Sequence, residues 1–133
     1  MSSHKEKLSI LSEMIAFAKV DNKIKKSEYD FLFNVAQHLG ITKRTFDELF
    51  EIEVEHIIPK SQADRIVQFN RLVLLMNVDN QQDLIEIKRL HDMGLAMGLP
   101  PGAIQQVLSI MHQYPDKIVP PAVLIDIFKA YYN

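Results

Sequence analysis

Apolar residues recur at helical spacing along this chain, in segments separated by short polar or proline-containing breaks. The first such segment predicts a helix over residues 5–19, before the polar stretch 21–23. Its apolar positions are Leu8, Leu11, Ile15 and Ala18. The later segments predict six more helices, over residues 28–39, 43–51, 62–77, 81–97, 101–112 and 120–132. A short alternating segment, 51–55, has the period of a strand, but it continues a helix and is better interpreted as a helix end or linker.

Polar side chains and glycines mark the ends of these predicted helices. Ser27, Thr42 and Ser61 are each expected to accept a hydrogen bond from a backbone N–H in the first turn of the following helix. Gly40 and Gly98 are expected to end two helices, because glycine adopts the left-handed conformation that a helix terminus requires.

The order of these elements repeats after 58 residues. Residues 14–50 align without a gap on residues 72–108, and apolar positions match along most of the alignment. The identical pairs are Val20/Val78, Asp21/Asp79, Asn22/Asn80, Glu28/Glu86, Leu32/Leu90 and Gly40/Gly98. Two copies of one three-helix unit therefore use one pattern of packing.

A single three-helix unit of this kind cannot cover its own apolar faces. We therefore predict one all-α domain over residues 1–133, with units over about 8–52 and 61–113 packed about a pseudo-two-fold axis. The helix over about 120–132 has no repeat counterpart. Its apolar side is expected to cap the core, with a dimer face as the alternative.

Each repeat carries an Asp followed seven residues later by a Glu, on either side of a turn between helices. The pairs are Asp21 with Glu28 and Asp79 with Glu86. In one interpretation the Asp ends a helix and the Glu stabilises the first turn of the next. In the other, the four carboxylates converge near the pseudo-axis and bind Ca²⁺ or Mg²⁺. An EF-hand is excluded, because Phe17 and Lys19 would occupy ligand positions.

The stretch Met14–Ile24, followed by Glu28 and by Leu39-Gly40-Ile41, resembles the tellurite-resistance TerB-like family. It is also similar to the helical domain of membrane-anchored J-domain co-chaperones. The family's Ala-Asp-Gly reads Val20-Asp21-Asn22 here. The resemblance implies an all-α fold with internal pseudo-symmetry and no known enzymatic activity. It also implies that Asp21, Glu28, Asp79 and Glu86 form an acidic cluster that binds a metal or a partner.

Composition and charge narrow the functional classes. The chain lacks cysteine, which excludes thiolate zinc sites. Its net charge of −2 gives the chain as a whole no electrostatic attraction to nucleic acid. The longest apolar run, residues 72–76, is far shorter than the roughly 20 residues of a membrane span. The polar start has no signal-peptide pattern, which favours a cytoplasmic location.

Other chemical groups show weaker patterns. The histidines, His4, His38, His56, His91 and His112, have no metal-binding spacing. Asp47, Glu51 and Glu55 would form one acidic stripe with Glu48 if the third helix continued. Lys23, Lys25, Lys26, Lys43 and Arg44 are expected to gather at one end of the first unit, as a solvated face or an anion contact. No nucleophile motif or phosphate loop is present.

These observations predict a non-enzymatic, cytoplasmic TerB-like adaptor that binds a protein partner in stress or tellurite response, with dependence on Ca²⁺ or Mg²⁺ left open. The alternative is a co-chaperone-type interaction domain whose carboxylates are purely structural. Neither a nucleic-acid partner nor a membrane span is expected, and the chain is expected to be a monomer or homodimer.

Overall fold

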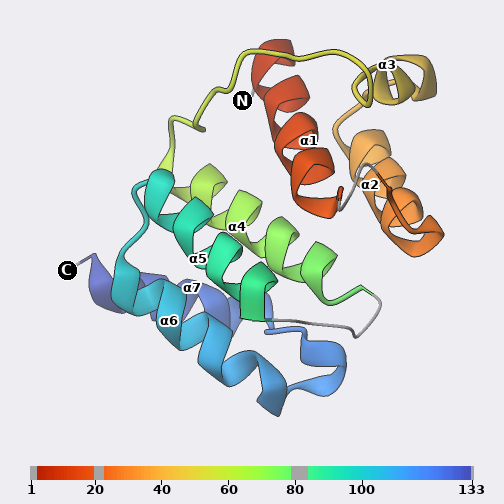
Figure 1. The fold of residues 1–133 in the computed structure, drawn as a ribbon. Coiled ribbons are helices and arrows are strands. Elements are labelled where there is room, and N and C mark those ends of the chain that lie inside the picture. The colour runs from red at the N-terminus through yellow and green to blue at the C-terminus, as the bar shows by residue number, and fades with distance from the viewer. Residues whose placement is uncertain (1–2, 20–22, 79–83, 133) are drawn as a thin grey trace. The chain divides into compact units, whose positions relative to one another are not determined.

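The computed structural model describes residues 3–19, 23–78 and 84–132. These residues form seven α-helices and two short 3₁₀-helices, without a β-strand (Figure 1). The α-helices are α1 (His4–Ala18), α2 (Lys26–His38), α3 (Lys43–Glu48), α4 (Gln62–Met76), α5 (Leu84–Ala96), α6 (Pro101–Ile110) and α7 (Pro121–Tyr131). The 3₁₀-helices are η1 (Met111–Gln113) and η2 (Pro115–Lys117). The predicted all-α fold class is confirmed.

The chain divides into two compact units, Met1–Lys60 and Ser61–Asn133. Shifted by 58 residues, the bounds of α1 and α2 coincide with those of α4 and α5, and α3 and α6 begin at equivalent positions. The order of the helices, and the bounds of the first two in each unit, agree with the predicted repeat, whereas α6 is longer than α3. The pseudo-two-fold axis and the grouping of both units into one domain stay predictions.

The helices α2 and α5 end in the same way. Gly40 has φ +74° and Gly98 has φ +81°, as predicted from their place after a helix. After α2, the Ile41 N–H donates to the Ala36 carbonyl at 2.9 Å, and the Gly40 N–H donates to the Gln37 carbonyl at 3.0 Å. Equivalent bonds close α5. The left-handed glycine thus satisfies carbonyls that the helix leaves without partners.

Two of the three predicted N-caps are confirmed, and one is wrong. Thr42 accepts a hydrogen bond from the Thr45 N–H at 3.2 Å, and Ser61 accepts one from the Asp64 N–H at 3.1 Å. Ser27, by contrast, lies exposed inside the first turn of α2, which begins at Lys26. The helix begins earlier than predicted because Glu28, rather than Ser27, supplies the side-chain cap.

An aromatic cluster closes the first unit. Phe46 is fully buried, and its ring centroid lies 5.3 Å from Tyr29, 5.3 Å from Phe50 and 5.6 Å from Phe33. Edge-on and tilted ring pairs at these distances stabilise a core beyond the area that they bury. The cluster joins α2 to α3 and to the turn that follows α3.

In the second unit α4, α5 and α6 lie side by side (Figure 1). Gly94 of α5 allows this close packing, because a Cβ atom there would lie 2.7 Å from Ile104 Cδ1 of α6. The last helix, α7, packs on α6 and buries Leu124, Ile127 and Phe128. The apolar side of this helix therefore packs within the second unit, and its covering of a core shared by both units stays a prediction.

Candidate functional site

Glu28, one of the four predicted acidic site residues, acts as a helix cap. Its Oε1 accepts a hydrogen bond from the backbone N–H of Lys25 at 3.1 Å, at the start of α2. A carboxylate here also interacts favourably with the helix dipole. Asp21, its predicted companion, lies outside the described residues.

Glu86 occupies the equivalent place in the second unit, in the first turn of α5, where it is half-buried. Asp79 lies outside the described residues. Within residues 3–19, 23–78 and 84–132, no group of three or more His, Asp or Glu side chains is arranged to hold a metal ion. The convergence of the two acidic pairs therefore stays a prediction.

The cap predicts a measurable contribution to stability. Glu28→Ala is expected to lower the free energy of unfolding by about 1 kcal/mol, because it leaves the Lys25 N–H without its acceptor. Glu28→Gln keeps an acceptor oxygen and is expected to lose less. Urea denaturation checks both, with the exposed Glu55→Ala as a control that changes stability by less than about 0.5 kcal/mol. An equal loss for Ala and Gln would contradict the cap.

The condition for the acidic stripe is not met, because α3 ends at Glu48, and Glu51 and Glu55 follow it in turn and irregular structure. Asp47 is instead bonded within the first unit. It accepts a hydrogen bond from the Tyr29 hydroxyl at 2.6 Å, and Lys43 Nζ lies 2.8 Å from its second oxygen. These bonds tie α2 to α3 at the edge of the aromatic cluster.

The same bonds shift two pKa values in opposite directions. The hydrogen bonds from Lys43 and Tyr29 lower the pKa of Asp47 below 3.8, and the bond to Asp47 raises the pKa of Tyr29 above 10.0. The contribution of Asp47 to stability is therefore present above its unfolded pKa and is lost as the pH falls through the folded value. The contribution of Tyr29 is present below pH 10.0 and is lost as the pH rises through its folded pKa.

An absorbance titration of the tyrosines checks this arrangement. Asp47→Asn is expected to lower the pKa of Tyr29 toward about 10, because the neutral amide is a weaker acceptor and adds no negative charge. Tyr29→Phe identifies the component of the curve that belongs to this residue. A wild-type curve that overlays the Asp47→Asn curve would contradict the bond.

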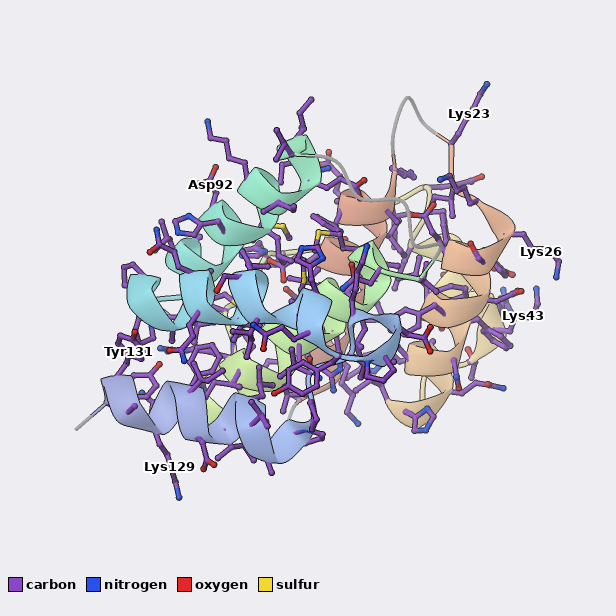
Figure 2. The ribbon with its side chains drawn as sticks, turned by 90° about the horizontal axis from the view of Figure 1, so that it is seen from below. Lys23, Lys26, Lys43, Asp92, Lys129 and Tyr131 are labelled. Carbon is purple, nitrogen blue, oxygen red and sulfur yellow. The ribbon has the colours of Figure 1, made fainter. Side chains whose placement is uncertain are left out.

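The predicted basic group is largely neutralised by its own helices. Three of its members form ion pairs one turn apart: Lys26 with Asp30 at 3.2 Å, Lys43 with Asp47 at 2.8 Å and Arg44 with Glu48 at 3.5 Å. Lys23, Lys26 and Lys43 project outward from the ribbon (Figure 2). This pattern is that of a solvated face rather than an anion site.

His91, which aligns with Phe33 in the repeat, lies half-buried in α5. Its Nδ1 lies 3.9 Å from Asp92 Oδ1, whereas its buried Nε2 has no hydrogen-bond partner among the described residues. An unsatisfied buried polar atom costs about 1–3 kcal/mol. The second unit thus has an imidazole where the first has the Phe33 ring, and the unsatisfied nitrogen lowers its stability.

Replacing this imidazole is expected to stabilise the protein. His91→Phe removes the unsatisfied nitrogen and restores the ring type found at the repeat position, which predicts a gain of about 1 kcal/mol. Thermal unfolding measures the gain, and His112→Phe, at an exposed position, is the matched control. A lower melting temperature for His91→Phe would show that the imidazole makes a favourable contact.

A groove of about 490 Å³ lies between α5 and α6 in the second unit. Leu84, Ile87 and Leu108 supply apolar surface, and Lys88, His91 and Asp92 are among its polar residues. A second groove, of about 380 Å³, lies in the first unit beside α1 and residues 49–54. There Lys19 Nζ donates to the Phe50 carbonyl at 2.9 Å. Neither groove was predicted from the sequence.

The α5–α6 groove lies where the first unit is filled by aromatic rings. Shifted by 58 residues, its lining residues Ile87, His91 and Leu108 correspond to Tyr29, Phe33 and Phe50. Those three rings pack around or beside Phe46 in the first unit. Smaller side chains at the same repeat positions therefore leave the second unit open.

The start of α5, where Leu84 lines the groove, also differs from its repeat counterpart. Leu84 is 84% exposed and the next residue, Ile85, is 72% exposed, whereas the equivalent residues of the first unit are Lys26 and Ser27. Two aliphatic side chains thus stand in solvent where the other unit has polar ones. A comparison of the exposed positions of the two repeats would have revealed this apolar surface from the sequence.

Comparison of the chain with protein-family models, with curated proteins and with solved structures gives no match. Among the helices of the described residues, none is both long enough and apolar enough to cross a membrane.

Proposed function

We propose that the chain is a non-enzymatic protein-binding adaptor that holds its partner in the α5–α6 groove. The observation that carries this proposal is the groove itself, open in the second unit where aromatic rings fill the first. Leu84, which lines the groove together with Ile87 and Leu108, is 84% exposed, and contiguous exposed apolar surface of this kind marks interaction sites.

The repeated carboxylates have a structural role in this proposal. Glu28, in the first turn of α2, accepts a hydrogen bond from the N–H of the N-cap residue Lys25, and we assign the same role to Glu86 in the first turn of α5. The proposal thus follows the co-chaperone-type alternative, in which binding does not depend on Ca²⁺ or Mg²⁺. The resemblance to the TerB-like family links such an adaptor to stress or tellurite response in the cytoplasm.

Small organic probes test whether the groove is a binding surface before any partner is known. Benzyl alcohol, titrated into ¹⁵N-labelled protein, is expected to shift the amide resonances of α5 and α6 around the groove more than those of other helices. Sites that bind proteins concentrate apolar contact energy in such recesses.

A variant that fills the groove is the matched control. Ile87→Tyr with Leu108→Phe introduces the residues that the first unit has at these positions, so the fold is expected to accept them. The variant should unfold at a similar temperature and lose the probe-induced shifts. Shifts scattered over the whole surface, or shifts unchanged in the filled variant, would overturn the proposal.

A further inference from the structure

We infer that the α5–α6 groove binds an amphipathic helix of a partner protein, through an aromatic anchor flanked by one acidic and one basic residue. This inference rests on the proposed function and specifies the chemistry of the partner.

The walls of the groove indicate a helical partner. Both walls are α-helices, whose backbone groups bond within each helix, so they offer no edge for an added strand. Residues of both helices line the groove, and a helix packs its own side chains into the space between two helices. An amphipathic helix therefore matches this surface better than an extended peptide.

The first unit indicates what fills the recess. There, the rings of Tyr29 and Phe50 contact Phe46 and each other, with centroids 5.3–5.7 Å apart. The second unit has Ile87 and Leu108 in place of the two outer rings. A partner that inserts one aromatic side chain restores the kind of packing that the first unit supplies from its own chain.

The charges on the rim indicate the flanking residues. Lys88 and Asp92 border the groove four residues apart, which is one turn or about 6 Å along α5. Within the described part of the chain Lys88 forms no ion pair, and Asp92 approaches only His91 Nδ1, at 3.9 Å. Asp92 is 63% exposed and points away from α5 (Figure 2).

Two exposed charges of opposite sign at this spacing match a partner helix with an acidic and a basic residue one turn apart. The acidic residue lies opposite Lys88 and the basic residue opposite Asp92. The order of the two charges then fixes the direction in which the partner helix runs along α5.

Synthetic peptides test the inference. The reference peptide has about 20 residues, with one Phe at the centre of a leucine face and with a Glu and a Lys one turn apart beside it. Isothermal titration calorimetry is expected to show binding to the wild-type protein. Replacing the Phe by Ala in the peptide should weaken binding by about thirtyfold, the loss typical of a buried aromatic anchor.

Variants of the protein test each element of the groove. Leu84→Ser removes a side chain that is 84% exposed, so folding is preserved, and it should weaken binding by about tenfold. Ile125→Ser, at a residue of α7 that is 49% exposed and lies outside the groove lining, is the matched control and should bind like the wild type.

Lys88→Glu should weaken the reference peptide by about fivefold, and a peptide with Lys in place of its Glu should recover that loss. The filled variant, Ile87→Tyr with Leu108→Phe, should bind none of the peptides.

Several results would overturn the inference. One is equal affinity for the Phe and Ala peptides, and another is full binding by the filled variant. A third is a dimer, detected by sedimentation, that Leu84→Ser dissociates and Ile125→Ser does not, since the occupant would then be a second copy of this chain. If benzyl alcohol maps to the groove but no peptide binds, the inference fails and the proposed function stands. If neither probe reaches the groove, both fail.

Discussion

Phe46→Ala is expected to lower the free energy of unfolding by about 3–5 kcal/mol, which is the usual cost of emptying a buried aromatic site. Phe46 is fully buried, and the rings of Tyr29, Phe33 and Phe50 all pack against it. Its loss leaves three half-buried rings without their common contact. Urea denaturation followed by circular dichroism measures the change.

The matched control for this variant is Ile52→Ala, in the turn after α3, where the side chain is 52% exposed. It is expected to change stability by less than about 0.5 kcal/mol. A loss below about 1 kcal/mol for Phe46→Ala would contradict the aromatic cluster as the core of the first unit.

Gly94→Val is expected to destabilise the second unit by about 3 kcal/mol, near the upper end of the usual cost of overpacking. A Cβ atom on Gly94 would lie 2.7 Å from Ile104 Cδ1 and 3.3 Å from Phe69 Cδ1. Valine adds two further methyl groups to that crowded position, so the side chains of Ile104 and Phe69 must shift or α5 must move away from α4 and α6. Thermal unfolding measures the loss.

A double-mutant cycle identifies the contact responsible. Gly94→Ala places a Cβ against Ile104, and Ile104→Val removes the Cδ1 atom that it meets. The double variant is expected to lose about 0.5 kcal/mol or more less stability than the sum of the two single losses. If the two losses of stability simply add, Ile104 Cδ1 is not the atom that excludes a side chain at position 94.

Much of the fold was predictable because helix boundaries depend on local chemistry. Gly40 and Gly98 end helices since they alone among nearby residues adopt positive φ without strain. Thr42 and Ser61 cap helices since their hydroxyls lie next to free N–H groups of the first turn. The repeat of 58 residues then predicted the same helix order twice.

The errors arose where two local signals competed. Ser27 is a good capping residue, but Glu28 already satisfies the Lys25 N–H, so α2 begins before Ser27. The third helix was predicted to continue through Glu51, but it ends at Glu48. Asp47 bonds to Tyr29 and Lys43, and these tertiary contacts are invisible to a count of helical periodicity.

The α5–α6 groove was missed because spacing along one segment does not show which side chains fill the space between two helices. The difference between Ile87 and Tyr29, or between Leu108 and Phe50, is conservative in a pattern of apolar positions. In the folded units the same difference separates a filled aromatic cluster from an open recess. The volume of the side chains at these positions, rather than their polarity, decides whether the groove is open.

The claim at the centre of this account is that the carboxylates of Glu28 and Glu86 stabilise the starts of α2 and α5, so that binding takes place in the α5–α6 groove and needs no cation. Thermal unfolding of the metal-stripped protein, with and without millimolar Ca²⁺, Mg²⁺ or Mn²⁺, tests it most directly. The account predicts the same melting temperature in each case. Stabilisation by one cation, of about 2.7 kcal/mol at 100 times its dissociation constant and lost in Asp21→Ala with Asp79→Ala, would contradict it.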